Sequence, residues 1–172
     1  IVPVYNGEAD LPDLLACLRS QTYPTDRIEY LLVDNNSSDR SAATIQQAIS
    51  EFPAQACLLQ ENQIQSSYAA RNTGIRAATS DILAFTDADC RPQPNWLEKL
   101  VQPFANPEIG IVVGEIEALP SYTFWEKYAE YRQVLSQQYT LEHPFSPYGQ
   151  TANLALRRET LQAVGLFRSH LT

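Results

Sequence analysis

The chain has 172 residues, of which 44% are hydrophobic and 19% charged; this balance fits one compact domain and excludes disorder for most of its length. Lys and Arg number 12 and Asp and Glu number 20, so the net charge is -8. Because that charge repels a phosphate backbone, we expect no nucleic-acid partner. The sequence contains neither an apolar run of about 18 residues that could cross a bilayer nor a signal peptide, which predicts a soluble chain.

The three cysteines, Cys17, Cys57 and Cys90, lie far apart and lack the CxxC spacing of a metal or redox motif. We expect Cys17 and Cys57 to be small buried residues in a reducing compartment, which points to the cytoplasm. Ile1 opens within an apolar run without a starting Met, and Thr172 follows closely on a helix end at Gly165. We therefore expect residues 1–172 to form a single domain that is truncated at both ends.

Strand and helix patterns alternate along the first two thirds of the chain. Leu11, Leu14, Leu15 and Leu18 recur at the spacing of an amphipathic helix, directly after an apolar strand and an Asn-Gly turn. Strands are predicted at 1–5, 28–33, 56–59 and 82–86, and helices at 11–18, 45–52, 69–78 and 96–104. This alternation predicts an α/β fold with an open, mostly parallel sheet and helices on both faces.

The last third of the chain has mixed patterns. Strands are predicted at 110–119 and 151–156, and a helix at 158–164 that ends at Gly165. Between the two strands, 122–139 predicts an aromatic helix with Phe124, Tyr128, Tyr131 and Leu135 at helical spacing. Its aromatic stripe is expected to pack against the sheet; a wall for an acceptor or a lipid surface is the alternative.

Acidic and amide side chains follow four of the predicted strands, where an open parallel sheet places its ligand site. No glycine-rich phosphate loop follows any strand, so a bound phosphate would need a cation. Asp87 and Asp89 leave the end of a buried strand two residues apart, and such carboxylates suit Mg²⁺ or Mn²⁺ held together with diphosphate oxygens. An Asp-x-Asp pair also occurs in ordinary polar turns, and its position at a strand end favours the metal.

Four segments in order carry a family resemblance. They are Ile1–Asn6, Leu32–Asp39, Ala70–Ile75 and Phe85–Asp89, and they are joined by a fifth match over Gly149–Phe167. Together they resemble the family 2 glycosyltransferases of GT-A fold, over residues 1 to about 168. The resemblance implies a GT-A type, Rossmann-like open sheet and an inverting transfer of sugar from a nucleotide-sugar donor, assisted by Mn²⁺ or Mg²⁺.

The resemblance also implies roles for single residues. Pro3 and Tyr5 would lie beside the base and ribose, Asp34 would contact the base, and Asp87 the ribose or the metal. Asp89 would coordinate the metal that bridges the diphosphate. Asn35 stands where relatives often have Asp, and its amide can donate hydrogen bonds as well as accept them. The identity of the nucleobase is therefore left open, with UDP as the favoured nucleotide. Arg71 is either a nucleotide contact or a helix-surface arginine.

The catalytic base is not assigned to a residue of this chain. An inverting transfer needs a carboxylate that takes the acceptor proton, and in relatives this acid follows the segment that matches Val164–Phe167. No acid follows Glu159 in the sequence, so the base is expected beyond Thr172. Glu159 itself stands at a predicted helix start, where an interaction with the helix dipole is the expected role.

Two alternatives use the same residues. A haloacid-dehalogenase-type phosphatase would use Asp87 as nucleophile and Asp89 as acid and base, although Arg91 stands where that motif has Thr or Val. A non-catalytic nucleotide-sugar binding module is the other. The resemblance implies a saccharide or lipid-linked acceptor, a role in cell-wall or polysaccharide synthesis, and a cytoplasmic location with peripheral membrane association of the full-length protein.

Overall fold

The computed structural model describes residues 1–119, 123–132, 135–145 and 147–168. In these ranges the strands are β1 (Val2–Val4), β2 (Glu29–Asp34), β3 (Gln55–Gln60), β4 (Ile82–Phe85), β5 (Ile111–Val113) and β6 (Leu154–Arg157). The α-helices are α1 (Leu11–Arg19), α2 (Ser41–Ala48), α3 (Ser67–Ala77), α4 (Trp96–Val101), α5 (Phe124–Tyr131), α6 (Gln137–Leu141) and α7 (Arg158–Val164). Short 3₁₀ turns are η1 (Thr25–Arg27), η2 (Ile49–Glu51), η3 (Gln102–Ala105) and η4 (Thr151–Asn153).

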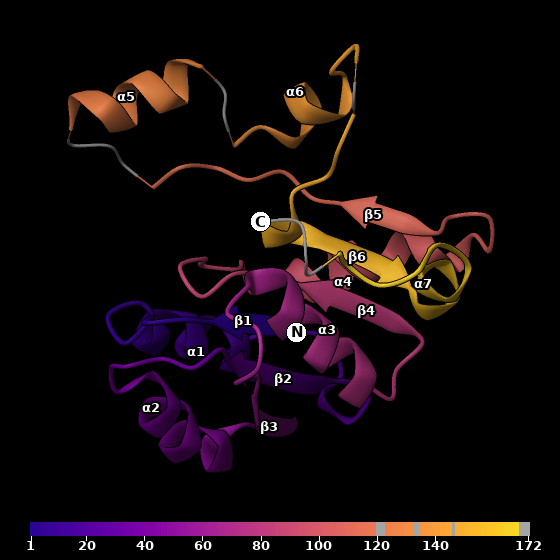
Figure 1. The fold of residues 1–172 in the computed structure, drawn as a ribbon. Helices are drawn as coiled ribbons and strands as arrows, with labels where there is room; N and C mark the ends of the chain where they lie inside the picture. The colour runs from indigo at the N-terminus through magenta and orange to yellow at the C-terminus, as the bar shows by residue number, and fades with distance from the viewer. Residues whose placement is uncertain (120–122, 133–134, 146, 169–172) are drawn as a thin grey trace.

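The strands form two ladders that meet at β1 and β4 (Figure 1). One ladder is parallel in the order β1-β2-β3, and the other is antiparallel in the order β4-β6-β5. Ile1 N–H donates to Ala84 O at 2.8 Å and Thr86 N–H donates to Ile1 O at 3.4 Å, the pattern of a parallel pair between Ile1 and Phe85. The sheet is therefore mostly parallel, with β6 alone among the described strands running the opposite way.

Successive side chains of the strands point to opposite faces of the sheet, and both faces are buried. Val2, Val4, Tyr30 and Leu32 pack under α1, α2 and α4, where the predicted leucine stripe of α1 is almost fully buried. The other face of the sheet packs against α3 and α7 and contains a second cluster. Its members are Leu31, Ile75, Ala78, Leu83, Phe85, Leu154, Leu156 and Leu161. Helices on both faces confirm the predicted fold class.

The predicted strand 110–119 is wrong beyond Val113. β5 ends there, and Asn153 packs against Gly114, the residue that follows the strand. Gly114 N–H donates to Asn153 O, and a Cβ on Gly114 would lie 2.4 Å from Asn153 Nδ2. Asn153 also accepts a hydrogen bond from the Trp96 indole. The start of the predicted strand 151–156 is likewise the 3₁₀ turn η4. The predicted helix 96–104 changes to 3₁₀ at Gln102, one residue before Pro103, and the predicted helix 45–52 changes after Ala48.

The aromatic helix predicted over 122–139 consists of two shorter helices, α5 and α6, and Tyr122 lies outside the described residues. Packing of its stripe against the sheet is wrong, because Phe124 is 73% exposed and Tyr131 83%. Figure 1 shows α5 and α6 standing away from the sheet; we name residues 123–132 and 135–145 the α5–α6 lobe. Buried Gln137 holds it to the body by donating to Gln150 O at 2.9 Å.

Two further sequence predictions concern cysteines and membranes. Cys17, Cys57 and Cys90 are all free thiols, but each is half-buried, so the expectation of full burial for Cys17 and Cys57 is wrong. Cys57 lies on β3, which among the described strands pairs with β2 alone and forms the edge of the parallel ladder. Within the described ranges no helix is both long and apolar enough to cross a membrane.

Candidate functional site

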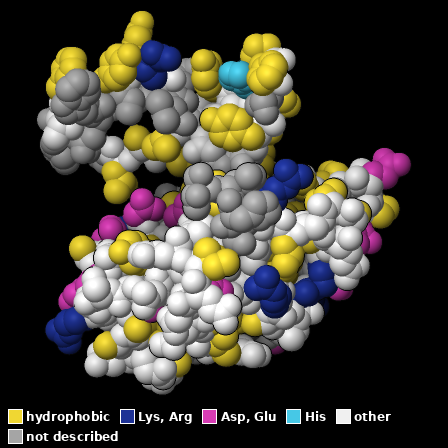
Figure 2. All heavy atoms as spheres, in the orientation of Figure 1, with side chains coloured by type: hydrophobic (Ala, Val, Ile, Leu, Met, Phe, Trp, Pro, Cys, Tyr) yellow, Lys and Arg dark blue, Asp and Glu magenta, His cyan; other side chains and the backbone are white. Residues whose placement is uncertain are grey.

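A pocket of about 570 Å³ opens where β1 and β4 end at the same edge of the sheet. Its walls come from β1 and the turn after it, from the loop after β4, and from the N-terminal part of α3. The lining residues are Pro3, Val4, Tyr5, Asn6, Gly7, Asp10, Asn35, Gln65, Ser66, Ser67, Arg71, Asp87, Ala88 and Asp89. In Figure 2, acidic side chains gather at the edge of the body that faces the α5–α6 lobe.

The turn after β1 is held by the polar loop that follows β2. Asn6 adopts a left-handed φ of 49°, a conformation that Asn tolerates in tight turns. Its side-chain Oδ1 accepts from Ser38 N–H at 2.8 Å, and Gly7 N–H donates to Ser41 Oγ at 2.9 Å. These bonds fix the backbone on which Tyr5 stands, and the Tyr5 side chain is 53% exposed at the pocket.

Arg71 and Asp87 form an ion pair across the pocket, with Nη2 and Oδ1 2.6 Å apart. Arg71 is buried, so the helix-surface alternative is wrong. Its Nε is enclosed without a partner among the described residues, whereas its Nη2 is neutralised by the Asp87 carboxylate. The ion pair therefore ties the loop after β4 to α3, and it places the Arg71 guanidinium at the pocket wall.

Asp89 is exposed, and the hydrogen bond described for its carboxylate is a long one from Cys90 Sγ at 3.9 Å. Asp87 is half-buried and one of its oxygens belongs to the Arg71 pair. No cluster of three or more acidic, His or Cys ligands occurs in the part of the chain that the structure describes. Mg²⁺ and Mn²⁺ do not need one, because one or two carboxylates suffice when a substrate diphosphate supplies the other oxygens. The donor set therefore fits such a cation.

Asp34 and Asn35 differ in what they leave for a ligand. Asp34 is 4% exposed; its Oδ2 accepts from Ser37 N–H at 3.3 Å, and its buried Oδ1 has no partner in the described residues. The Asn35 amide donates to Glu61 O at 2.8 Å and to Ile64 O at 2.9 Å. Both amide hydrogens of Asn35 are thus used by the loop after β3, so they are not free to donate to a base.

Glu61 completes this loop. Its Oε2 accepts from the Thr73 hydroxyl at 2.7 Å, and its Oε1 accepts from the backbone N–H groups of Gln63 and Ile64. The Thr73 hydrogen bond, followed by these two backbone bonds, lowers the pKa of Glu61 below its usual value. The loop leads directly into Gln65, Ser66 and Ser67 of the pocket wall.

The structure brings most of the predicted site together. Pro3, Tyr5, Asn35, Arg71, Asp87 and Asp89 all line the one pocket. Asp34 is adjacent to Asn35 but is not among the lining residues. Glu159 lies elsewhere: Arg157 pairs with Ile82 at the start of β4, so Glu159 is at the opposite edge of the sheet from Asp87. Its exposed carboxylate is 3.8 Å from Arg157 Nε.

Sequence reasoning missed Asn72. Its buried side chain donates to Phe167 O at 2.7 Å and accepts from Phe167 N–H at 3.0 Å, so the amide pairs with the backbone that follows α7. Phe167 also stacks on Tyr68 at a ring separation of 6.2 Å and meets Phe85 edge-on at 5.7 Å. The segment after α7 is thereby held beside Arg71 on α3. No local pattern could reveal a partner 95 positions away.

Replacing Asn72 by Asp should destabilise the chain by about 2–4 kcal/mol, because a buried carboxylate would face the Phe167 carbonyl oxygen without a hydrogen to donate. Urea unfolding measures this loss, and trypsin cleavage at Arg168 measures release of the segment. Arg76→Ala, an exposed change on the same helix, is the control. Equal stability and equal cleavage in the two variants would contradict the role of Asn72.

Comparison with known proteins identifies the family of the chain. Residues 1–165 match the sequence family described as Glycosyl transferase family 2, and the chain belongs to that family. The fold is of the GT-A type, and the pocket lies at the carboxyl ends of β1 and β4. The family match favours the glycosyltransferase interpretation over the phosphatase alternative.

Three similar proteins illustrate the match. The chain is 34% identical to Glycosyltransferase AglE of Haloferax volcanii, over 99% of this chain and 56% of the relative. It is 29% identical to the undecaprenyl-phosphate 4-deoxy-4-formamido-L-arabinose transferase of Pseudomonas aeruginosa, over 100% of this chain and 50% of that protein. The solved mannosyltransferase PcManGT of Pyrobaculum calidifontis, in complex with GDP-Man and Mn²⁺, superposes with a TM-score of 0.76 at 25% identity, covering 98% of this chain and 46% of that one. The chain thus spans about half the length of the relatives it matches.

Proposed function

We propose that the chain is the donor-binding part of an inverting glycosyltransferase that uses a nucleoside diphosphate sugar and a divalent cation. One observation carries the proposal: Tyr5, Arg71, Asp87 and Asp89 converge on a single pocket at the ligand edge of a sheet from this family. The neighbouring PcManGT structure, with its bound GDP-Man and Mn²⁺, supports the same ligand classes.

The proposed roles follow from charge and exposure. Tyr5 offers an exposed ring face and a hydroxyl to the base and ribose, with Pro3 beside it. Asp34 has a buried carboxylate oxygen with no partner in the described residues, suited to accept an N–H of the base. Asp87, fixed by Arg71, would contact the ribose or the cation. Asp89 would hold Mn²⁺ or Mg²⁺, which would neutralise charge on the departing diphosphate.

Arg71 gives the pocket a second positive charge close to where the diphosphate would lie. In the structure this charge is paired with Asp87, so the side chain stays ordered in the absence of a ligand. The acceptor hydroxyl would approach from the opposite face of the sugar, where a carboxylate removes its proton. We propose that this base lies beyond Thr172, since Glu159 is at the far edge of the sheet.

The donor base is proposed to be uracil, with guanine as the competing base because PcManGT binds GDP-Man. The acceptor is proposed to be a saccharide or a lipid-linked saccharide, for which the undecaprenyl-phosphate transferase is the supporting relative. We also propose that the full-length protein contacts the cytoplasmic face of a membrane and acts in polysaccharide synthesis.

The test is a thermal-shift panel of UDP, GDP and dTDP with and without Mn²⁺. A nucleotide at 100 times its dissociation constant should stabilise the chain by about 2.7 kcal/mol, which is a shift of several degrees. We expect the largest shift with UDP and Mn²⁺ together. If none of the three nucleotides shifts the unfolding midpoint with Mn²⁺ present, the pocket is not a donor site.

Asp89→Ala should abolish the Mn²⁺-dependent part of that shift and change the unfolding free energy of the free chain by no more than about 0.5 kcal/mol, since the Asp89 side chain is exposed and weakly bonded. Asp26→Ala is the matched control, because Asp26 is an exposed aspartate in η1, just before β2 and away from the strand ends. A large loss of stability in Asp89→Ala would instead indicate a structural carboxylate.

A further inference from the structure

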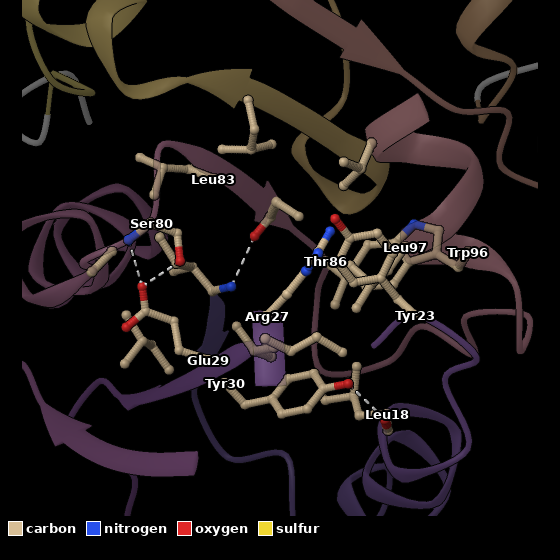
Figure 3. Close-up of a pocket in the computed structure, with 18 of the residues that line it drawn as sticks. Leu18, Tyr23, Arg27, Glu29, Tyr30, Ser80, Leu83, Thr86, Trp96 and Leu97 are labelled. Carbon is tan, nitrogen blue, oxygen red and sulfur yellow. Dashed lines mark hydrogen bonds between the residues drawn. The ribbon is translucent and has the colours of Figure 1, made fainter. Parts of the chain in front are cut away.

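Asp89 stands in the loop that joins β4 to α4. The far end of this loop is fixed, because Trp96 and Leu97 at the start of α4 lie in the apolar layer with Tyr23. Figure 3 shows these three side chains around a second pocket, of about 240 Å³, between β2 and β4. The near end of the loop continues β4 of the sheet. The place of Asp89 between the two ends therefore depends on the contacts that the loop itself makes.

The Asp89 side chain does not hold the loop in place. Cys90 N–H donates to Asp87 O at 3.1 Å, and this bond closes a four-residue turn over Asp87–Cys90. The hydrogen bond described for the Asp89 carboxylate is the long one from Cys90 Sγ, at 3.9 Å. The backbone of the turn therefore sets the position of this carboxylate, and whatever holds the turn also holds Asp89.

Arg91 directly follows the turn, and its guanidinium joins the turn to α1. Its Nη1 donates to Cys90 O, the carbonyl at the end of the turn, at 3.1 Å. Its Nη2 donates to Asp10 Oδ1 at 2.9 Å, and its Nε donates to Asp13 Oδ2 at 3.2 Å. The three bonds use the planar fork of an arginine, which holds several acceptors in one fixed geometry. The end of the turn is thereby tied to the first turn of α1.

The start of α1 offers two carboxylates to Arg91. Asp10 precedes the helix, where an Asp side chain usually accepts a hydrogen bond from a helix N–H, but no such bond forms within the described residues. Its carboxylate accepts from the guanidinium instead. Asp13 lies three residues further on and so shares that face of the helix. The contact with the loop thus takes the place of an ordinary helix cap.

The same contacts divide the charges of the donor pocket. The carboxylates that line it are those of Asp10, Asp87 and Asp89. Asp87 pairs with Arg71. Asp10 pairs with Arg91, and within the described ranges no ion pair is found for Asp89. Asp89 is therefore the acid that is left to hold a cation, and both of its acidic neighbours in the pocket are neutralised.

We propose that Arg91 is a positioning residue for Asp89. Arg71 on α3 holds the beginning of the turn, Arg91 ties its end to α1, and the backbone between them carries the Asp89 carboxylate. This inference rests on the proposed function, in which Asp89 holds the cation. Arg91 is not among the residues that line the pocket, so it acts through the turn and not by contact with the donor.

The experiment measures how far Mn²⁺ tightens nucleotide binding. Calorimetry gives the dissociation constant of UDP, or of GDP if the thermal-shift panel favours it, in EDTA and in Mn²⁺. We name the ratio of these two constants the Mn²⁺ coupling. Removing a group that orients a metal ligand costs about 10- to 100-fold in metal affinity, so the coupling should fall at least about tenfold in Arg91→Gln. Binding in EDTA should stay close to that of the unchanged chain, because Arg91 does not line the pocket.

Arg19→Gln is the matched control. Arg19 is the last residue of the same helix, and it forms a surface ion pair with Glu51, away from the donor pocket. Both variants should lower the unfolding midpoint by no more than about 3 °C, as expected for surface ion pairs. Arg19→Gln should keep the Mn²⁺ coupling. Arg91→Lys should recover it only in part, because an ammonium group keeps the charge without the fork.

Several outcomes would overturn the inference. Equal Mn²⁺ coupling in Arg91→Gln and Arg19→Gln would make Arg91 a surface ion pair and no more. Full recovery in Arg91→Lys, or equal weakening of nucleotide binding in Mn²⁺ and in EDTA, would assign the effect to charge alone. A rise in coupling would mean that Arg91 only keeps Asp10 from the cation.

The unchanged chain separates this inference from the proposed function. If it binds neither UDP nor GDP, the proposed function fails, and the inference fails with it. If it binds nucleotide with Mn²⁺ coupling and Arg91→Gln does the same, the inference alone fails. Should Arg91→Gln not fold, Arg91→Lys provides the same comparison.

Discussion

A protein that continues beyond Thr172 should transfer sugar at least about 100-fold faster than the 172-residue chain, while the two bind donor nucleotide with similar affinity. This expectation rests on the proposed function. Loss of a general base costs about 10² to 10⁴ in rate, and in the proposed function donor affinity depends on Tyr5, Asp87 and Asp89 of the pocket, which both proteins contain.

The structure supports this expectation through two positions. Asn72, the neighbour of the pocket residue Arg71 on α3, holds the Phe167 backbone. Glu159 is at the start of α7, across the sheet from Asp87. Phe167 is therefore held closer to this pocket than Glu159 is.

The measurement is a transfer assay on both lengths, with Glu159→Gln in the longer protein. We expect the Glu159→Gln protein to keep its rate within about twofold. Equal rates from the short and the long protein would contradict a base beyond Thr172. A collapse of the Glu159→Gln rate with unchanged donor affinity would assign the base to Glu159. Neither outcome would affect the thermal-shift test of donor binding.

The chain that starts at Ile1 should gain about 4 kcal/mol in unfolding free energy between pH 5 and pH 8, from the α-amino group alone. Burial lowers the pKa of this group from 8.0 to about 5 in the folded chain. Between these values the unfolded chain holds the proton and the folded chain does not, so lowering the pH favours unfolding. Below pH 5 both states hold the proton, and above pH 8 neither does.

Urea unfolding at several pH values measures this dependence. The matched control is the same chain with an acetylated amino terminus, which shares every other titrating group. The difference between the two proteins should rise with pH at a slope of up to about 1.4 kcal/mol per unit and level off above pH 8. Parallel pH profiles would mean that the amino group is hydrated in the folded chain.

Much of the fold could be predicted because its helices and strands are encoded locally. The leucines of α1 and the apolar run of β2 indicate their burial within a few residues of sequence. The direction of β6 could not be predicted, because an isolated apolar tetrapeptide has no signal for which way its neighbours run. The predicted packing of the α5–α6 lobe was wrong for a related reason: an aromatic stripe predicts a buried face without specifying what covers it.

The candidate site divides in the same way. Asp87 and Asp89 could be found because acidic residues at a strand end are a local pattern, and Arg71 could be found because it lies within Ala70–Ile75, a segment of the family resemblance. The hydrogen-bond partners of Asn35 and Asn72 could not be predicted. Asn35 uses its amide hydrogens on a loop 26 and 29 positions away, and Asn72 reaches across 95 positions. Only the folded chain brings these partners together.

The position of β6 between β4 and β5 has a consequence for the order of folding. β6 pairs with β4 across 69 to 75 positions, from Phe85 and Leu154 at one end to Ile82 and Arg157 at the other. During synthesis β1, β2 and β3 can pair as soon as residue 60 has left the ribosome, whereas the edges of β4 and β5 that face β6 wait for residues 154–157. Until then, two apolar strand edges lack their shared partner, so the second half of the sheet is the late-folding and aggregation-prone half of the chain.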